Sequence, residues 1–185
     1  MTETASIESS SQALASLAEN AGMYLTFELG GEVYGVEILK VQEIIGMMNV
    51  TRVPRTPAFV RGVVNLRGKV IPVVDLRLKF GLDEKEDTEK TCIIVVQLEE
   101  AGQNTTMGII VDEVSEVIDV NADQIEPPPD FGVSVKTDFI LGMGKIGEQV
   151  LMMLDISKVL AREEVAELSS MQSTDSDAQQ DTPAN

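Results

Sequence analysis

Hydrophobic and polar residues alternate along several short runs of the chain. In residues 23–29 every second side chain is large and apolar, and a glycine pair follows at 30–31. A period of two is typical of a strand with one buried face, and paired glycines favour a tight turn. Residues 34–38 continue the alternation and predict the return strand of a hairpin. Residues 41–48 then carry apolar side chains three and four positions apart, which predicts a short helix.

A second hairpin is predicted between residues 63 and 80. Two β-rich runs there flank the turn sequence Arg67-Gly68-Lys69. Pro72 lies inside the second run, and because proline cannot donate a backbone hydrogen bond, it predicts a sheet edge or a bulge.

Further strands are predicted at 91–98 and 105–111, after a charged loop at 82–90. Asp155 stands before an apolar pattern with helical spacing, so we expect it to cap a helix that runs to about residue 168. Turn residues recur at short intervals and long helical patterns are scarce. The chain is therefore expected to be mainly β and built from barrels, not from a parallel βαβ sheet.

The two halves of the sequence resemble each other. Residues 35–44 match 108–117, and residues 70–79 match 150–158 in the same order, with Asp75 and Asp155 in register. Two ordered matches favour an internal duplication over a chance similarity of Val- and Ile-rich segments. We therefore expect two small β-subdomains of similar build.

Composition indicates one folded unit between two tails. The chain has 185 residues, of which 43% are hydrophobic. A core of this size needs neither disulfides nor a metal. Residues 1–20 and 166–185 contain few side chains that could anchor a core, so we expect a disordered N-terminal tail, a domain at 21–165 and a disordered acidic C-terminal tail.

The charge and the rare residue types exclude several classes of function. The formal charge is -17, which disfavours nucleic acid and anionic membrane surfaces as partners. Histidine is absent and Cys92 is the single cysteine, which excludes His-dependent nucleophile pairs and nearly all zinc sites. No run is long enough for a membrane span, and a single thiol suits a reducing cytoplasm. We expect no cofactor.

Three motifs have structural interpretations that outweigh their chemical ones. Residues 142–147 read G-x-G-x-x-G, but they lead into a strand, which favours a hairpin over a dinucleotide site. Cys92 lies in an apolar strand with no imidazole to activate it. Asp75 lacks the adjacent acidic pair of a phosphoacceptor site. A small-molecule-binding or enzymatic barrel using Asp75, Asp112 and Glu116 stays open as an alternative, as does phosphorylation at Asp75.

One stretch of the acidic chain is strongly basic. Residues 52–79 carry a net charge of about +6 with Asp75 as their single acid. Their seven basic residues are Arg52, Arg55, Arg61, Arg67, Lys69, Arg77 and Lys79. Such a stretch is either a solvated face or a docking surface for an acidic protein, for which it would accelerate and orient association.

At these residues the chain resembles the CheW family of bacterial chemotaxis coupling proteins. The similarity covers about residues 22–165 and is sharpest at 34–44, at 57–68 and at 71–77. It implies two SH3-like, five-stranded β-barrels around a shared core, with short helices, a C-terminal helix and no catalytic activity. The coupling domains of CheV and CheA are related, but the receiver of one and the kinase core of the other are not found here.

The resemblance also implies partners and a surface. Proteins of this family link the cytoplasmic tips of chemoreceptors to the regulatory domain of the histidine kinase CheA, in cytoplasmic arrays at the membrane. By position, Arg67 is expected in the receptor groove, with Val41, Glu43 and Ile44 in the neighbouring surface. We expect Glu43 and Arg67 to be exposed, whereas Val41 and Ile44 could equally be core. No residue is assigned to the kinase.

Overall fold

The computed structural model describes residues 17–100, 102–129 and 138–160 of the chain. Residues 1–16 and 161–185 lie outside the described residues, and with them most of the predicted N-terminal tail, the whole predicted C-terminal tail and the predicted helix beyond residue 160. Within the described residues, Leu17 packs against the apolar cluster around Tyr24, and the Tyr24 hydroxyl donates to the carbonyl of Asn20 at 2.7 Å.

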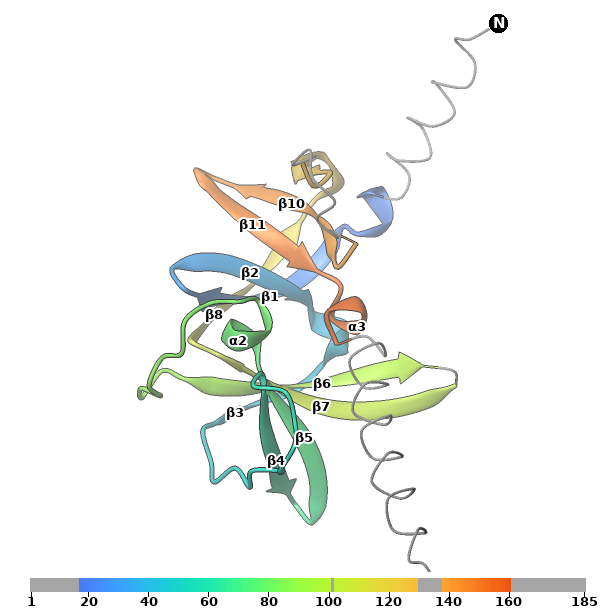
Figure 1. Ribbon diagram of the computed structural model, residues 1–185. Coiled ribbons are helices and arrows are strands. Elements are labelled where there is room, and N and C mark those ends of the chain that lie inside the picture. The colour runs from blue at the N-terminus through green and yellow to red at the C-terminus, as the bar shows by residue number, and fades with distance from the viewer. Residues whose placement is uncertain (1–16, 101, 130–137, 161–185) are drawn as a thin grey trace, which may run out of the picture.

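The described strands form two sheets, which confirms the mainly β fold (Figure 1). The six-stranded sheet has the order β8 (Glu113–Val120), β1 (Gly22–Leu29), β2 (Glu32–Glu37), β11 (Gln149–Leu154), β10 (Ile140–Ile146) and β9 (Ile125–Glu126). The five-stranded sheet has the order β3 (Val41–Gly46), β6 (Cys92–Glu100), β7 (Gln103–Val111), β5 (Lys69–Asp75) and β4 (Val60–Leu66). The short helices are η1 (Ile38–Lys40), α2 (Leu76–Lys79), η2 (Ala122–Gln124) and α3 (Ile156–Val159).

Each sheet closes on itself. Beyond β3, Thr51 pairs with Val63 of β4 through two backbone hydrogen bonds of 2.8 Å, and we call the barrel closed by this pair the first barrel. In the six-stranded sheet, β8 continues through η2 into β9, which pairs with β10, and this is the second barrel. Counting β8 and β9 as one interrupted strand gives five strands to each barrel, as the resemblance implied.

The two halves of the chain exchange hairpins. The β1–β2 hairpin of the first half lies in the second barrel, where β2 pairs in parallel with β11. The β6–β7 hairpin of the second half lies in the first barrel, where β7 pairs in parallel with β5. The two similar units expected from the repeat are present, but each barrel contains strands from both halves of the sequence.

The repeat extends to local detail. β4 and β10 have the same sequence of buried and exposed positions, and both show a register shift at the same place. Asp75 and Asp155 cap α2 and α3, as expected for Asp155. The backbone N–H of Asp75 donates to the Phe59 carbonyl at 2.7 Å, and that of Asp155 to the Phe139 carbonyl at 2.8 Å.

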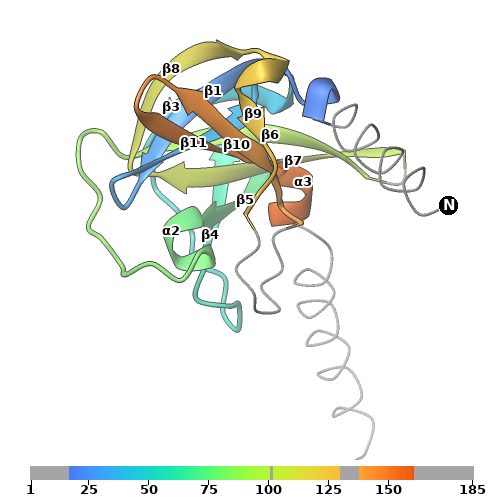
Figure 2. The ribbon, with the colours of Figure 1, turned by 90° about the horizontal axis from the view of Figure 1, so that it is seen from above.

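Apolar side chains form three clusters, one inside each barrel and one between the barrels. Strand β6 shows why: Ile93 and Val95 point into the first barrel, whereas Ile94 and Val96 point into the shared cluster. Both faces of the strand are buried, so its sequence is a continuous apolar run and not an alternation. The view from above shows the strands of the second barrel lying over those of the first (Figure 2).

The helix predicted over residues 41–48 is wrong, because residues 41–46 form strand β3, which directly follows η1. A bulge shifts the register between Val41 and Glu43, so that Val41 faces the shared cluster and Ile45 faces the first-barrel cluster. A bulge inserts one residue into the period of two. The helical spacing of Val41, Ile44 and Met48 is therefore misleading, because Ile44 and Met48 are exposed and do not share a buried face with Val41.

The predictions for residues 142–147 and for Pro72 are confirmed. Residues 142–147 lie in the β10–β11 hairpin, and Gly147 has a positive φ of 61° in its turn. Pro72 lies in β5, where it is paired with Val63 of β4. The pairing of β5 with β7 begins only at the next residue, Val73, so Pro72 lies in a stretch of β5 that has β4 as its one described neighbour.

Closure of the first barrel depends on Gly62. Its φ is +142°, and a Cβ there would lie 2.1 Å from the carbonyl oxygen of Thr51. We predict that Gly62→Ala lowers the free energy of unfolding by about 2–4 kcal/mol, because the clash is with backbone and cannot relax by side-chain rotation. Urea denaturation followed by circular dichroism measures this loss. Gly46→Ala is the matched control, since nothing lies within 4 Å of its Cβ position; equal losses in both variants would contradict the prediction.

Candidate partner-binding site

Arg67 is presented at the tip of the β4–β5 hairpin. The two turn residues, Arg67 and Gly68, have positive φ values of 52° and 83°. Positive φ at both central residues is the requirement of the tight turn that matches the twist of two antiparallel strands. The side-chain oxygen of Asn65 accepts from the backbone N–H of Gly68 at 2.8 Å and stabilises the turn. The Arg67 side chain is 73% exposed, which confirms the expectation for it.

Arg67 forms an ion pair with Glu43 of β3. Strands β3 and β4 are the two ends of the five-stranded order, so the ion pair joins the hairpin tip to the opposite edge of the first barrel. Glu43 is on the same face of β3 as Ile45, which packs against the first-barrel cluster. Its side chain is only 21% exposed, so the expectation that Glu43 is exposed is wrong.

The structure separates the two apolar residues predicted at this surface. Ile44 points away from the barrel interior and is 45% exposed. Val41 is partly buried and packs against the shared cluster. Ile44 therefore belongs to the surface, and Val41 belongs to the edge of the core.

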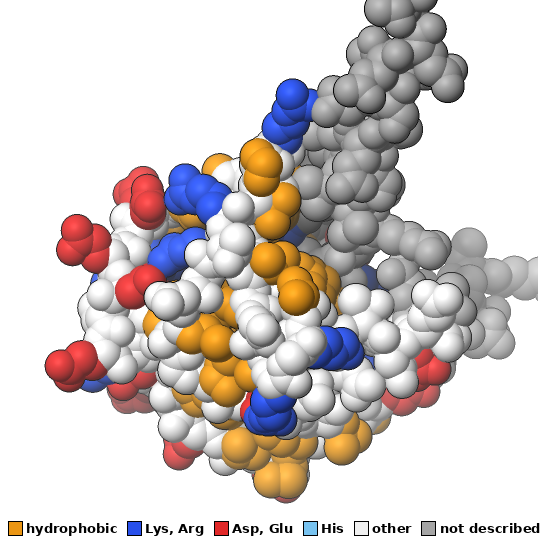
Figure 3. All heavy atoms as spheres, turned by 90° about the horizontal axis from the view of Figure 1, so that it is seen from below, with side chains coloured by type: hydrophobic (Ala, Val, Ile, Leu, Met, Phe, Trp, Pro, Cys, Tyr) orange, Lys and Arg blue, Asp and Glu red, His pale blue; other side chains and the backbone are white. Residues whose placement is uncertain are grey.

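Exposed apolar side chains accompany the ion pair. Val70, two residues beyond the Arg67-Gly68 turn, is 64% exposed, and Met48 is also exposed. Figure 3 shows the face formed where Figure 1 places β3, β4 and β5: several groups of apolar side chains gather there, with Lys and Arg side chains beside them. We call Ile44, Met48, Arg67 and Val70 the first-barrel patch.

The second barrel repeats part of this patch. Val117 and Val150 stand at the repeat positions of Ile44 and Val70, and both are exposed. The position of Arg67, however, is taken by Gly147. The two barrels thus share an exposed apolar pair, and the guanidinium distinguishes the first from the second.

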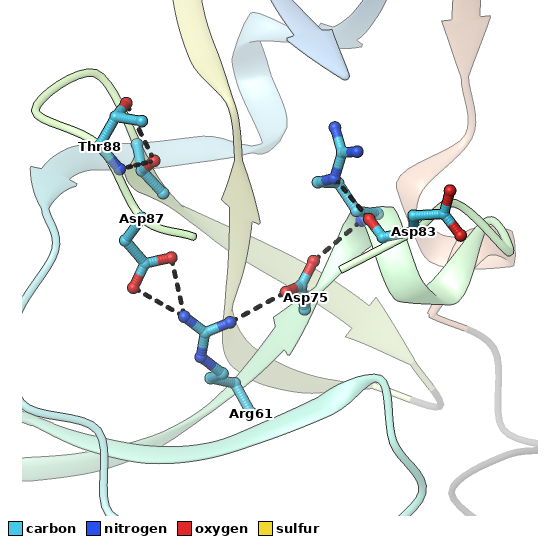
Figure 4. Close-up of polar contacts among 7 residues, drawn as sticks. Arg61, Asp75, Asp83, Asp87 and Thr88 are labelled. Atoms are coloured by element: carbon cyan, nitrogen blue, oxygen red, sulfur yellow. Dashed lines mark hydrogen bonds and ion pairs between the residues drawn. The ribbon is translucent and has the colours of Figure 1, made fainter. Parts of the chain in front are cut away.

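Two cations of the basic stretch, Arg61 and Arg77, are engaged inside the molecule. Arg61 donates to Asp75 at 3.0 Å and to both carboxylate oxygens of Asp87 at 2.8 and 2.7 Å (Figure 4). Arg77 donates to Asp112 at 2.5 Å and to the backbone carbonyl of Asp83 at 3.0 Å. These contacts attach the acidic loop at 82–90 to the first barrel, so the basic stretch is not a uniformly solvated face.

Asp75 has a structural environment. It is buried, and burial raises the pKa of its carboxyl, while the backbone N–H of Leu78 and the charge of Arg61 act in the opposite direction. The alternative catalytic set is not assembled: Asp75 pairs with Arg61, Asp112 with Arg77, and Glu116 is exposed on β8. Within the described ranges, no three acidic or cysteine side chains gather where they could hold a metal ion.

Cys92 behaves as a packing residue. Its side chain is partly buried against the shared cluster, and burial raises the pKa of its thiol. A raised pKa lowers the thiolate fraction and hence the reactivity. This agrees with the prediction from sequence.

The protein consists of two fused barrels, and its candidate site presents exposed apolar side chains and an arginine. Such a surface is typical of proteins that bind other proteins. No helix in the described part of the chain is long and apolar enough to cross a membrane. Residues 23–164 match the model of the CheW-like domain. The chain belongs to the CheW-like family.

Individual relatives agree with this assignment. The Chemotaxis protein CheW of Klebsiella aerogenes is 46% identical over 143 residues, which are 77% of this chain and 84% of that protein. The Chemotaxis protein CheW of Bacillus subtilis is 36% identical over 140 residues, 75% of this chain and 86% of that protein. The crystal structure of the scaffolding protein TtCheW from Thermoanaerobacter tengcongensis matches with a TM-score of 0.67 and 34% identity, covering 78% of this chain and 95% of that one. The protein is a chemotaxis adaptor and not an enzyme.

Sequence reasoning missed two features of this surface. The ion pairs of Arg61 with Asp75 and Asp87 join residues 14 and 26 positions apart, which no local pattern reveals. The exposed pair Val117 and Val150 was missed as well, although the internal repeat already aligned these residues with Ile44 and Val70.

Removal of Arg61 would leave Asp75 buried without its guanidinium. We predict that Arg61→Leu lowers the free energy of unfolding by about 2–4 kcal/mol at pH 7, somewhat less than the loss of one partner of a fully buried ion pair, because Arg61 is partly exposed. In Arg61→Leu with Asp75→Asn most of this loss should be recovered, because Asn keeps the oxygen that accepts from the Arg77 N–H. Urea denaturation of the single and double variants measures both effects.

The loss should depend on pH. Burial raises the pKa of Asp75 in the folded protein above its unfolded value, so the folded state binds the proton more readily. Ionised Asp75 therefore costs stability at neutral pH, and this cost declines as the pH falls through the raised pKa and is gone below the unfolded pKa. Without Arg61 the cost is larger. The difference between wild type and Arg61→Leu should be greatest near pH 7 and shrink on acidification; a difference that grows at low pH would contradict this account.

Proposed function

We propose that this protein couples chemoreceptors to the histidine kinase CheA, as a cytoplasmic component of receptor arrays. Its family and its adaptor class support the proposal. The first-barrel patch, with Glu43 holding Arg67, is proposed to bind the cytoplasmic tip of the receptor, and a separate surface binds the regulatory domain of the kinase.

The observation that carries the proposal is the unequal repetition of the exposed surface. Each barrel presents an apolar pair at equivalent positions, Ile44 with Val70 and Val117 with Val150. An arginine stands beside the first pair and a glycine beside the second. Apolar anchors supply most of the affinity of an interface, whereas charged groups fix orientation and partner choice. Two similar apolar pairs, one beside an arginine and the other beside a glycine, suit two different partners.

A coupling role follows if both surfaces are occupied together. The adaptor transmits a signal when the receptor state that binds it more tightly is also the state that favours one kinase conformation. No chemistry by the adaptor is required. The large shared core keeps the two barrels in fixed relation, so that a partner on one barrel has a defined position relative to a partner on the other.

Arg67→Glu should weaken receptor binding and leave the fold intact. The side chain is exposed, so loss of its ion pair costs at most about 0.5 kcal/mol of stability, whereas the reversed charge beside Glu43 repels the same partner surface. We expect at least about a tenfold loss of affinity, equal to 1.4 kcal/mol, for a receptor cytoplasmic fragment in co-sedimentation.

The matched control for Arg67→Glu is Lys145→Glu, which makes the same charge change on the exposed β10–β11 hairpin. It should leave receptor affinity unchanged. Equal effects of the two substitutions would indicate a general charge effect, and unchanged affinity together with unchanged receptor-dependent kinase activity in Arg67→Glu would refute the site assignment.

We assign the second-barrel pair to the kinase. Val150→Asp should reduce binding of the CheA regulatory domain by about tenfold or more, because a carboxylate in an apolar contact must be desolvated. Receptor binding should be retained. Val70→Asp is the reciprocal variant at the repeat position and should show the opposite selectivity. Isothermal titration with each partner alone measures both, and loss of the same partner in both variants would contradict the division of surfaces.

A further inference from the structure

The internal repeat allows two equivalent sites within the chain to be compared. At the start of α2, both carboxylate oxygens of Asp75 are used. Oδ1 accepts from the Arg77 backbone N–H at 3.0 Å, and Oδ2 accepts from the Arg61 guanidinium at 3.0 Å (Figure 4). This site is therefore complete: a capping carboxylate is neutralised by an arginine of the same half of the chain.

The equivalent site at α3 lacks the arginine. Asp155 stands at the position of Asp75, and Leu141 stands at the position of Arg61. Oδ1 of Asp155 accepts from the backbone N–H groups of Ser157 and Lys158 at 3.1 and 3.4 Å. Among the described residues, no side chain donates to Oδ2.

The second site carries an additional carboxylate. In the first site, Asp75 is paired in register with Ile110. In the second, Leu154 is paired with Val36, and continuing this parallel register by one residue places Glu37 opposite Asp155. The change from isoleucine to glutamate adds a negative charge at the place where the positive charge has been lost.

A pocket of about 300 Å³ occupies this place, bordered by Asn20, Glu37, Lys40, Leu141, Asp155 and Ser157. The charged residues of the lining are Glu37, Asp155 and Lys40, so the pocket carries a net negative charge. The neighbouring Tyr24 hydroxyl responds to this field: burial raises its pKa, and the charges of Glu37 and Asp155 raise it further. The volume is at the lower end of the range for small-molecule sites and fits one side chain better than a whole metabolite.

We propose that this pocket binds the guanidinium of an arginine side chain presented by a protein partner, in the place that Arg61 fills in the other half of the chain. Guanidinium matches the site better than ammonium, because its planar set of donors can reach two acceptors at once, here Oδ2 of Asp155 and the carboxylate of Glu37. Lys40 and the absence of a third nearby acidic side chain among the described residues disfavour a metal ion. The inference does not depend on which protein supplies the arginine.

A titration of the full chain with blocked amino acids tests the chemistry directly. ¹H–¹⁵N spectra are recorded with N-acetyl-L-arginine amide, with the lysine analogue, and with the uncharged citrulline analogue, which has nearly the same shape as arginine. We expect saturable shifts at Glu37, Lys40, Ser157 and Lys158, with a dissociation constant on the order of 1–10 mM for arginine. Citrulline and lysine should bind at least about tenfold more weakly.

Variants of the site sharpen the test. Asp155→Asn keeps a capping oxygen and should weaken arginine binding about tenfold or more, and Glu37→Gln should act in the same direction. Leu141→Arg should abolish binding by supplying the guanidinium internally. Glu148→Gln, an exposed acid of the same half in the β10–β11 turn, is the matched control and should change nothing.

Three results would overturn the proposal: no saturable shifts, equal binding of arginine and citrulline analogues, or unchanged binding in Asp155→Asn. Free arginine that binds tenfold more tightly than the blocked form would also overturn it, because this would indicate a metabolite site and not a side-chain site. Asp155→Asn and Glu37→Gln preserve side-chain shape, so the test remains decisive if Leu141→Arg does not fold.

Discussion

The apolar cluster between the barrels is the constraint on which the rest of the structure depends. Leu25 and Phe27 of β1 meet Ile94 and Val96 of β6 in this cluster, and Leu160 beyond α3 joins them. Each large aliphatic side chain buried here contributes roughly 1.5–3 kcal/mol. Because strands of both barrels give one face to this cluster, neither barrel can move without disturbing the core of the other. The surfaces that face partners are fixed on a single rigid body.

Aromatic packing reinforces this connection. The rings of Phe27, Tyr34, Phe80 and Phe139 stack in sequence, with centroids 5.9, 5.5 and 5.8 Å apart. The series runs from the β1–β2 hairpin of the second barrel through the end of α2 to the start of β10. Stacked pairs of this kind add to the free energy of area burial and favour one mutual orientation.

The sequence predicted most of the local structure and little of how distant segments meet. The hairpin at residues 23–38 was readable because one face of each strand is buried and a glycine pair marks the turn. Strand β3 was misread because Val41, Ile44 and Met48 have helical spacing, although Ile44 and Met48 are exposed and only Val41 packs against the shared cluster. The exposure of Arg67, expected from the family resemblance, agrees with its place in a turn, but the partial burial of Glu43 depends on the closure of the barrel, which no local pattern encodes.

The sequence was equally limited in predicting which charged side chains pair with each other. Composition placed a net positive stretch within an acidic chain, but the sequence could not say which of its cations are engaged internally. Arg61 and Arg77 bind acidic and carbonyl groups of the loop at 82–90 and of Asp112, whereas Arg67 extends from a turn into solvent. A count of charges therefore overstates the basic surface, and Arg67 at the hairpin tip is one of the cations that stay exposed on it.

The exchange of hairpins has a consequence for the origin of the fold. If one repeat existed alone, its first hairpin would lack the strands that complete a barrel, and two copies would have to donate hairpins to each other as a swapped homodimer. Joining the copies in one polypeptide replaces an association that depends on concentration with an intramolecular one. Fusion also releases the copies from identity, so that one could acquire Arg67 and the other Gly147: a symmetric ancestor becomes a molecule with two distinguishable ends.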